Sequence, residues 1–160
     1  MFRKQFILTE MNKLSLAWNM LPIKYLNLFY HPDLYVNFLK SKKSEIYLLG
    51  SLYDWDEPHL SNIEILNKLA ASTSISELLN NVSRYSGEFV IIYVNSEDFF
   101  IFNDACGQSE VYYDTTFKNF ATQPKLLAET IGIIPHNEFH AKKFYSSEVF
   151  DKYRLFVEES

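Results

Sequence analysis

The chain has 160 residues, an apolar content of 48% and a formal net charge of −5. This length fits one domain with a sizeable core, and the acidic balance argues against nucleic acid as a partner, because phosphate binding needs a basic surface. No apolar run approaches the roughly 20 residues that cross a bilayer, so we expect no membrane partner. The single cysteine, Cys106, cannot form an internal disulfide, and we predict a cytoplasmic protein.

The first third of the chain predicts strands. The apolar and aromatic residues favour strands at residues 2–9, 23–30, 34–40 and 45–53. The strand at 23–30 is expected to stop before Pro32, since a residue that precedes proline avoids the helical region. Residues 46–49 form a continuous apolar run, which is typical of a strand covered on both faces.

Two helices are predicted after these strands. Ser61 and Glu64 have the spacing of a capping box, in which the two residues satisfy free backbone groups at a helix start. Ser74 and Glu77 repeat this spacing. Apolar residues at helical intervals follow both boxes, so each predicts a helix with one buried face.

Strands are expected again from residue 87. Residues 87–94 and 99–103 predict a hairpin around a polar turn, and 110–113 and 120–122 predict two shorter strands. Pro124 is suited to begin a helix that ends at Gly132, and residues 146–158 predict another helix. This order of elements predicts an α+β fold in which helices flank two sheets.

Four sequence blocks carry a family resemblance. Residues 49–54 (Leu-Gly-Ser-Leu-Tyr-Asp) are similar to an Asn-Gly-Glu-Ile-Tyr-Asn strand end, and residues 86–90 (Ser-Gly-Glu-Phe-Val) to Asp-Gly-x-Phe-Ala. Residues 103–113 resemble an Arg-Asp-x-x-Gly-x-x-Pro-Leu-Tyr-Tyr stretch, and residues 120–127 resemble Phe-Ala-Ser-Glu-x-Lys-Ala-Leu. In this order, the blocks resemble the N-terminal class II glutamine amidotransferase domain of asparagine synthetases. The resemblance is densest at 46–130 and leaves the tail, 133–160, unassigned.

The resemblance implies a fold and a domain organisation. Its family has the Ntn-hydrolase fold, a four-layer αββα sandwich of two antiparallel sheets between helices. We therefore expect residues 1–160 to form a single amidotransferase-like domain of this kind.

The same resemblance implies that glutaminase chemistry is lost. The family's nucleophile is an N-terminal cysteine whose own α-amino group acts as the base, and Phe2 stands where that cysteine would be. The oxyanion hole of the family uses an Asn-Gly pair that corresponds to Leu49 and Gly50. The family's aspartate for the substrate amino group corresponds to Ser86. We predict no catalytic residue, and a vestigial pocket made of Phe2, Leu49, Gly50, Ser51, Ser86 and Gly87.

Other reactive residues are assigned structural roles. Cys106 has no basic residue close in sequence that would lower its pKa, so it is expected to be a turn residue. His136 and His140 lack the order of a zinc helix, and no metal site is predicted. The carboxylates around Trp55, at residues 54, 56 and 57, could bind a cation or assist acid–base chemistry, but a solvated loop before a helix is the expected arrangement.

These observations leave three hypotheses on function. The first is a degenerate amidotransferase-like domain, itself not catalytic, that serves as the N-terminal structural or docking domain of an asparagine-synthetase-like ATP-dependent amide ligase, of the asparagine synthase or lasso-peptide-cyclase type. Its partner would then be a C-terminal synthetase domain or another protein, and ATP and Mg²⁺ would belong to that domain, with no cofactor here. The second is a freestanding module that binds a small molecule or a protein. The third is an Ntn amidohydrolase whose nucleophile, such as Thr9 or Ser15, is exposed by processing.

Overall fold

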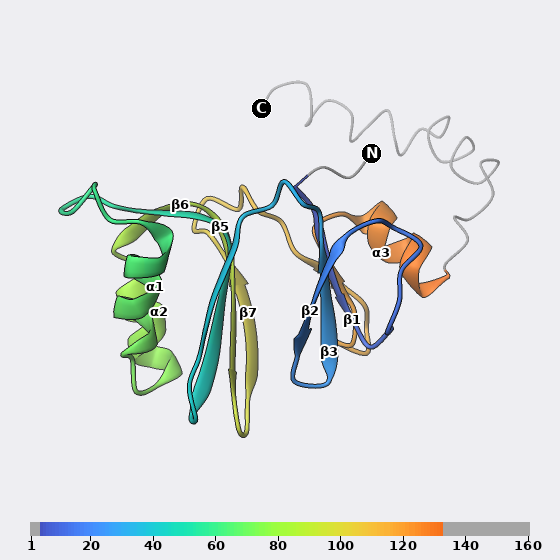
Figure 1. The fold of residues 1–160 in the computed structure, drawn as a ribbon, viewed down its shortest axis with the longest axis horizontal. Coiled ribbons are helices and arrows are strands. Elements are labelled where there is room, and N and C mark those ends of the chain that lie inside the picture. Colours follow the sequence, from blue (N-terminus) through green and yellow to red (C-terminus); the bar gives the residue numbers. More distant parts are fainter. Residues whose placement is uncertain (1–3, 133–160) are drawn as a thin grey trace, which may run out of the picture. The chain divides into compact units, whose positions relative to one another are not determined.

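The computed structural model describes residues 4–132, and Figure 1 traces them through two antiparallel sheets. This range contains nine strands and three helices, which makes the chain α+β and compatible with a sandwich. By its internal contacts the chain divides into two compact units, Met1–Leu127 and Ala128–Ser160, and the fold below is that of the first. Phe2, His136, His140 and the helix predicted at 146–158 lie outside the described residues.

A five-stranded sheet contains the first and the last strand of the described chain. Its strands are antiparallel in the order β2-β3-β1-β9-β8. The predicted strands at 110–113 and 120–122 are present but shorter. The five strands are β1 Phe6–Thr9, β2 Asn19–Ile23, β3 Leu26–Tyr30, β8 Tyr112–Tyr113 and β9 Phe120–Ala121.

The prediction of one strand at residues 23–30 was wrong. The structure places a two-residue turn at Lys24 and Tyr25, so that Ile23 ends β2 and pairs with Leu26 at the start of β3. Lys24 adopts a φ of +53°, a conformation that glycine or asparagine usually supplies in such turns. Because neither residue occurs here, the sequence carries no hairpin signal. Pro22 lies within β2, which is at the sheet edge, where proline is tolerated.

The four-stranded sheet follows the predicted strands closely. Its order is β4-β5-β6-β7, again antiparallel. The apolar run of β5 is covered on both faces as expected. Ile46 and Leu48 belong to a cluster with the helices, whereas Tyr47 and Leu49 belong to a cluster with the other sheet. The four strands are β4 Val36–Lys40, β5 Ser44–Asp54, β6 Tyr85–Asn95 and β7 Phe99–Asn103.

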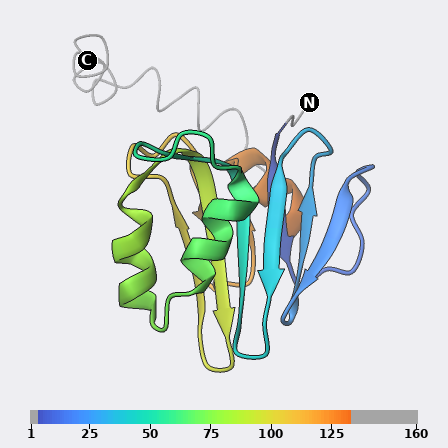
Figure 2. The ribbon, with the colours of Figure 1, turned by 60° about the vertical axis from the view of Figure 1, so that its left-hand side comes forward.

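Both predicted capped helices are present, α1 over Asn62–Ala70 and α2 over Ile75–Val82. The Glu64 carboxylate accepts hydrogen bonds from the backbone N–H and the hydroxyl of Ser61. In the second box, the Ser74 hydroxyl accepts a hydrogen bond from the Glu77 N–H. The Glu77 carboxylate, however, accepts from the backbone N–H and the hydroxyl of Thr73 and not from Ser74. The two helices cover one face of the four-stranded sheet, as Figure 2 shows from the helix side.

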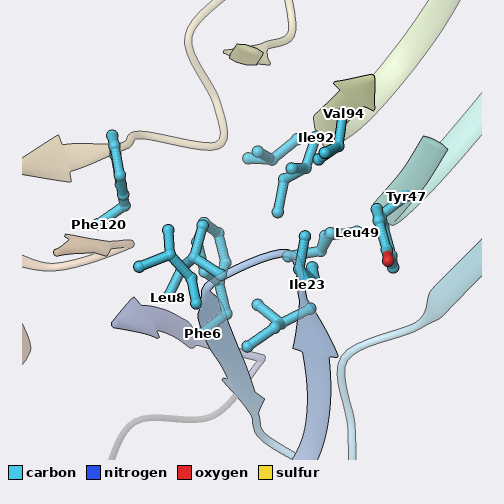
Figure 3. Close-up of a cluster of buried hydrophobic side chains, with 11 residues drawn as sticks. Phe6, Leu8, Ile23, Tyr47, Leu49, Ile92, Val94 and Phe120 are labelled. Carbon is cyan, nitrogen blue, oxygen red and sulfur yellow. The ribbon is translucent and has the colours of Figure 1, made fainter. Parts of the chain in front are cut away.

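The main core lies between the two sheets. Figure 3 shows Phe6 and Leu8 of β1 facing Leu49 of β5 and Ile92 of β6, together with Phe120 of β9. Burial of such side chains contributes about 1.5–3 kcal/mol each, so this cluster is the dominant force that holds the sheets together. The third helix, α3 Pro124–Ile131, begins at the predicted proline. In residues 4–132 no helix combines the length and the apolar character needed to cross a membrane.

Candidate functional site

An open cleft of about 1060 Å³ lies at one end of the two sheets. It borders β5 and β6 on one side and the start of β1 on the other, and two loops complete it. Its volume lies at the upper end of the roughly 300–1,000 Å³ that is usual for ligand pockets. The segments that line it lie within residues 4–6, 33–35, 49–53, 86–90, 106–110 and 122–125.

The pocket residues expected from the sequence meet in this cleft. Strand register explains why: in the β5–β6 pair, Ser51 lies opposite Glu88 and Tyr53 lies opposite Ser86. Segments about 35 residues apart in sequence are thereby brought side by side. Phe2 lies outside the described residues, and the others all line the cleft, namely Leu49, Gly50, Ser51, Ser86 and Gly87.

Two glycines allow β5 and β6 to approach closely at the cleft. Gly50 has a φ of +103°, and a Cβ there would lie 2.2 Å from the backbone oxygen of Glu88. Gly87 has a φ of +142°, and its Cβ would lie 2.1 Å from the backbone oxygen of Ser51. Both contacts are with backbone, which cannot rotate away. Glycine is therefore required at both positions by the shape of the strand pair itself.

Asn62, the first residue of α1, fixes the backbone of β5 beside the cleft. Its amide nitrogen donates to the Gly50 carbonyl at 3.0 Å, and its amide oxygen accepts from the Leu52 N–H at 3.0 Å. The Gly50 N–H donates to the Tyr35 carbonyl at 2.8 Å. These contacts hold the irregular part of β5 to α1 and to the segment before β4. Sequence reasoning missed Asn62, because it looked like an ordinary residue of the first helical turn.

We expect Asn62→Ala to destabilise the protein by about 2 kcal/mol, because two partly buried backbone groups lose their partner. Asn67→Ala is the matched control, since the Asn67 amide nitrogen donates only to the Ile63 carbonyl within the same exposed helix. We expect this control to cost at most about 0.5 kcal/mol. Urea unfolding followed by circular dichroism measures both. Equal losses would mean that Asn62 does not support β5.

The opposite wall of the cleft comes from the five-stranded sheet. The Phe6 N–H donates to the Thr122 hydroxyl at 3.3 Å, and the Thr122 hydroxyl donates to the side-chain oxygen of Gln5. Gln5 and Thr122 thus join the first and last strands of the fold at the cleft. No local sequence pattern predicts this pairing, because 117 positions separate the two residues.

The loop after β7 closes a third side, and a buried carboxylate organises it. Asp104 is 5% exposed and accepts from the backbone N–H groups of Cys106, Gln108 and Ser109 at 2.8–3.1 Å. Burial raises the pKa of Asp104, but these N–H groups outweigh burial and hold the pKa below its ordinary value. The carboxylate therefore stays charged near neutral pH and fixes the loop that carries Cys106.

The lining of the cleft is part polar and part apolar, and it carries both signs of charge. Lys4 and Lys125 contribute ammonium groups, and Asp33, Glu88 and Glu110 contribute carboxylates. Within residues 4–132, no three histidine, cysteine or acidic side chains are close enough together to hold a metal ion. The charged side chains favour a ligand with both hydrogen-bond donors and acceptors.

Two exposed tyrosines add aromatic surface to the cleft. Tyr53, on β5, is 60% exposed, and Tyr35, before β4, is 69% exposed. Tyrosines with this exposure can contact a ligand through the ring while the hydroxyl remains in water.

The cleft contains hydroxyl groups and a thiol, but they lack the partners of a nucleophile. An activated serine or cysteine normally donates a hydrogen bond to a base. Within the described residues, no base accepts a hydrogen bond from the hydroxyls of Ser51, Ser86 or Ser109 or from the thiol of Cys106. Cys106 is also exposed.

The other acidic residues singled out in the sequence have structural contacts. Asp54 accepts from the backbone N–H groups of Asp56 and Glu57, and so shapes the turn before α1. Lys68 pairs with the Glu57 carboxylate and approaches Asp54 at 3.9 Å. Trp55, 84% exposed, and the exposed Asp56 fit the expected solvated loop, whereas Asp54 is buried at 9% exposure at the end of β5.

Three comparisons with known proteins returned no match. No family model, no curated protein and no solved structure is significantly similar to the chain. The resemblance to amidotransferase domains therefore rests on the sequence blocks alone.

Proposed function

We propose that the chain is a degenerate amidotransferase-like domain of the Ntn-hydrolase type, without glutaminase activity, whose cleft persists as a binding site. In a longer protein it would be the N-terminal structural or docking domain of an asparagine-synthetase-like ATP-dependent amide ligase, of the asparagine synthase or lasso-peptide-cyclase type. One observation carries this proposal. The positions that correspond to the family's oxyanion hole and substrate-amine site, Leu49, Gly50 and Ser86, line a single cleft between neighbouring strands.

The arrangement of layers supports the same proposal. Two antiparallel sheets share a core, and α1 and α2 cover the outer face of one of them. Leu126 and Leu127, near the start of α3, are buried. Two packed antiparallel sheets with helices on an outer face are compatible with a sandwich of the Ntn type.

The chemistry of the cleft favours binding over glutamine hydrolysis. Leu49 has no side-chain amide to stabilise an oxyanion, and loss of one such donor costs on the order of 10²–10³ in rate. Ser86 has no charge with which to hold a substrate amino group. The cleft nevertheless has the volume and the mixed polar and apolar lining of a binding site.

The proposal can be tested by rebuilding the lost chemistry. In a Phe2→Cys, Cys106→Ser background, the only thiol is the one at the second position. We expect an electrophilic glutamine analogue to label this cysteine, with selectivity over the same electrophile lacking the α-amino and α-carboxylate groups. Adding Leu49→Asn and Ser86→Asp is expected to increase that selectivity by about tenfold, equivalent to about 1.4 kcal/mol.

Intact mass identifies the labelled residue, and release of glutamate measures hydrolysis. We expect the unaltered chain to release none. Equal labelling by both electrophiles in the rebuilt variant would contradict the proposal, because it would mean that the second residue does not face an amino-acid site. Hydrolysis by the unaltered chain would support the Ntn amidohydrolase alternative.

A freestanding binding module is the second candidate, and the exposed Tyr35 and Tyr53 favour it. A module of this kind needs no synthetase domain, so its ligand should bind to the isolated chain. We expect such a ligand to slow the modification of Cys106 by a soluble maleimide, since Cys106 lines the cleft. A screen of amino acids and short peptides with this readout would identify such a ligand.

A further inference from the structure

Strand β7 forms a free edge of the four-stranded sheet, and it lacks the usual protection of such an edge. It is the last strand in the order β4-β5-β6-β7 and pairs only with β6. Its sequence is Phe-Phe-Ile-Phe-Asn, with no proline and no charged residue. Unprotected apolar edges can pair with another chain, and natural proteins usually blunt them with lysine, proline or a very short strand.

The other three edges of the two sheets do carry such protection. Pro22 in β2 has no N–H to offer, and β8 is only two residues long. Strand β4 ends at the exposed Lys40. The contrast indicates that the edge at β7 is left available for a partner.

The register of the hairpin identifies which backbone groups face outward. The Asn95 N–H donates to the Asp98 carbonyl, and the Asp104 N–H donates to the Phe89 carbonyl. In and next to β7, the even-numbered residues therefore direct their backbone hydrogen bonds toward β6. In an antiparallel pair the alternate residues point their N–H and C=O groups the other way. Phe99, Ile101 and Asn103 therefore present theirs at the free edge. Among the described residues no partner strand receives these groups.

Charge determines the kind of strand that fits. Glu97 and Asp98, both exposed, lie at the start of β7 and have no ion pair within the described residues. Lys24 comes near this turn, where its ammonium donates to the Asn95 carbonyl at 3.4 Å. A second copy of this chain, paired antiparallel about Ile101, would place Asp98 opposite Asp104 of the first copy. Like charges in that position disfavour self-pairing.

We propose that β7 is a docking edge for an extended segment of another protein, which adds a fifth strand to the sheet and carries a lysine or arginine beside Glu97 and Asp98. Backbone hydrogen bonds at three outward-facing residues supply the pairing, and alternate side chains of the segment continue the apolar faces of the sheet. The proposal is independent of what the cleft binds.

Amide hydrogen exchange of the full chain tests the proposal. The probe is the peptide Lys-Val-Thr-Val-Thr-Val-Lys, which puts a lysine beside Asp98 in either orientation. We expect the amides of Phe99, Ile101 and Asn103 to exchange fast in the free protein and at least about tenfold more slowly with saturating peptide, as hydrogen-bonded strand amides do. The same peptide with terminal glutamates, or with prolines in place of the threonines, is expected to give no protection.

Two sets of variants separate the backbone and charge contributions. Asn103→Pro removes one outward N–H and leaves the bonds to β6 in place, so we expect it to weaken peptide binding at least fivefold without unfolding the sheet. Asn103→Ala is the matched control and should bind normally. Glu97→Lys with Asp98→Lys should reverse the preference, so that the glutamate-ended peptide now protects the edge.

Three results would overturn the proposal. Protection of the three amides in the free protein at all concentrations would mean that the chain covers its own edge. Protection that rises with protein concentration, together with a doubled mass in ultracentrifugation, would identify a second copy as the occupant. Failure of the lysine-ended peptide to protect the edge, or equal protection by all three peptides, would rule out strand addition guided by these charges.

Discussion

Gly50→Ala is expected to destabilise the protein by about 3–5 kcal/mol, because the strand pair β5–β6 has no room for a methyl group at this position. The added Cβ would meet the Glu88 carbonyl oxygen at 2.2 Å, far inside van der Waals contact. Overpacking of this kind costs about 1–3 kcal/mol, and a side chain at positive φ adds about 1–3 kcal/mol. Since domains of this size have a free energy of unfolding of about 5–15 kcal/mol, the variant would lose a large part of its stability. Urea unfolding monitored by circular dichroism measures the loss.

Gly107→Ala is the matched control for this prediction. Gly107 also has a positive φ, +66°, but a Cβ there would have no heavy atom within 4 Å. We expect its substitution to cost only the backbone strain, about 1 kcal/mol. The difference between the two variants isolates the clash between β5 and β6. If both lost the same stability, the close approach of the strands at the cleft would not be as the structure has it.

Local sequence signals predicted much of the fold correctly. The capping residues Ser61 and Ser74 placed both helices, and the apolar run at 46–49 identified the buried strand of the second sheet. These features depend on residues that are close in sequence. The hairpin of β2 and β3 was missed because Lys24 adopts a positive φ in its turn, and lysine is not a residue type that indicates this conformation.

The residues named from the sequence lie on one side of the cleft only. Leu49, Gly50 and Ser86 were identified by resemblance to a family, and strand register brings them together. The wall formed by Gln5 and Thr122 depends on pairing between the two ends of the fold, which no local pattern encodes. Asn62 was missed for a different reason. Its role requires the glycine-containing backbone of β5 to lie within reach of a helix start, and only the tertiary structure reveals that distance.

Substitution of Asp104 by alanine is expected to cost about 3 kcal/mol and to loosen the loop at the cleft. Three backbone N–H groups lose a charged acceptor in a site that is 5% exposed. Hydrogen bonds to charged groups contribute about 1.5–3 kcal/mol, and the unpaired donors remain partly buried. Asp98→Ala is the control, because Asp98 is exposed and its carboxylate makes no hydrogen bond within residues 4–132.

The pH dependence of the unfolding free energy separates the contribution of the negative charge of Asp104 from that of its packing. Its pKa in the folded protein lies below the ordinary value of 3.8, so its contribution to stability is complete above that value and is lost as the pH falls through the folded pKa. The gap in unfolding free energy between the unaltered protein and Asp104→Asn should therefore be largest at pH 7 and shrink toward pH 3. We expect urea midpoints at the two pH values to follow this course. A gap that stays constant would mean that the stability of the loop does not depend on the negative charge of Asp104.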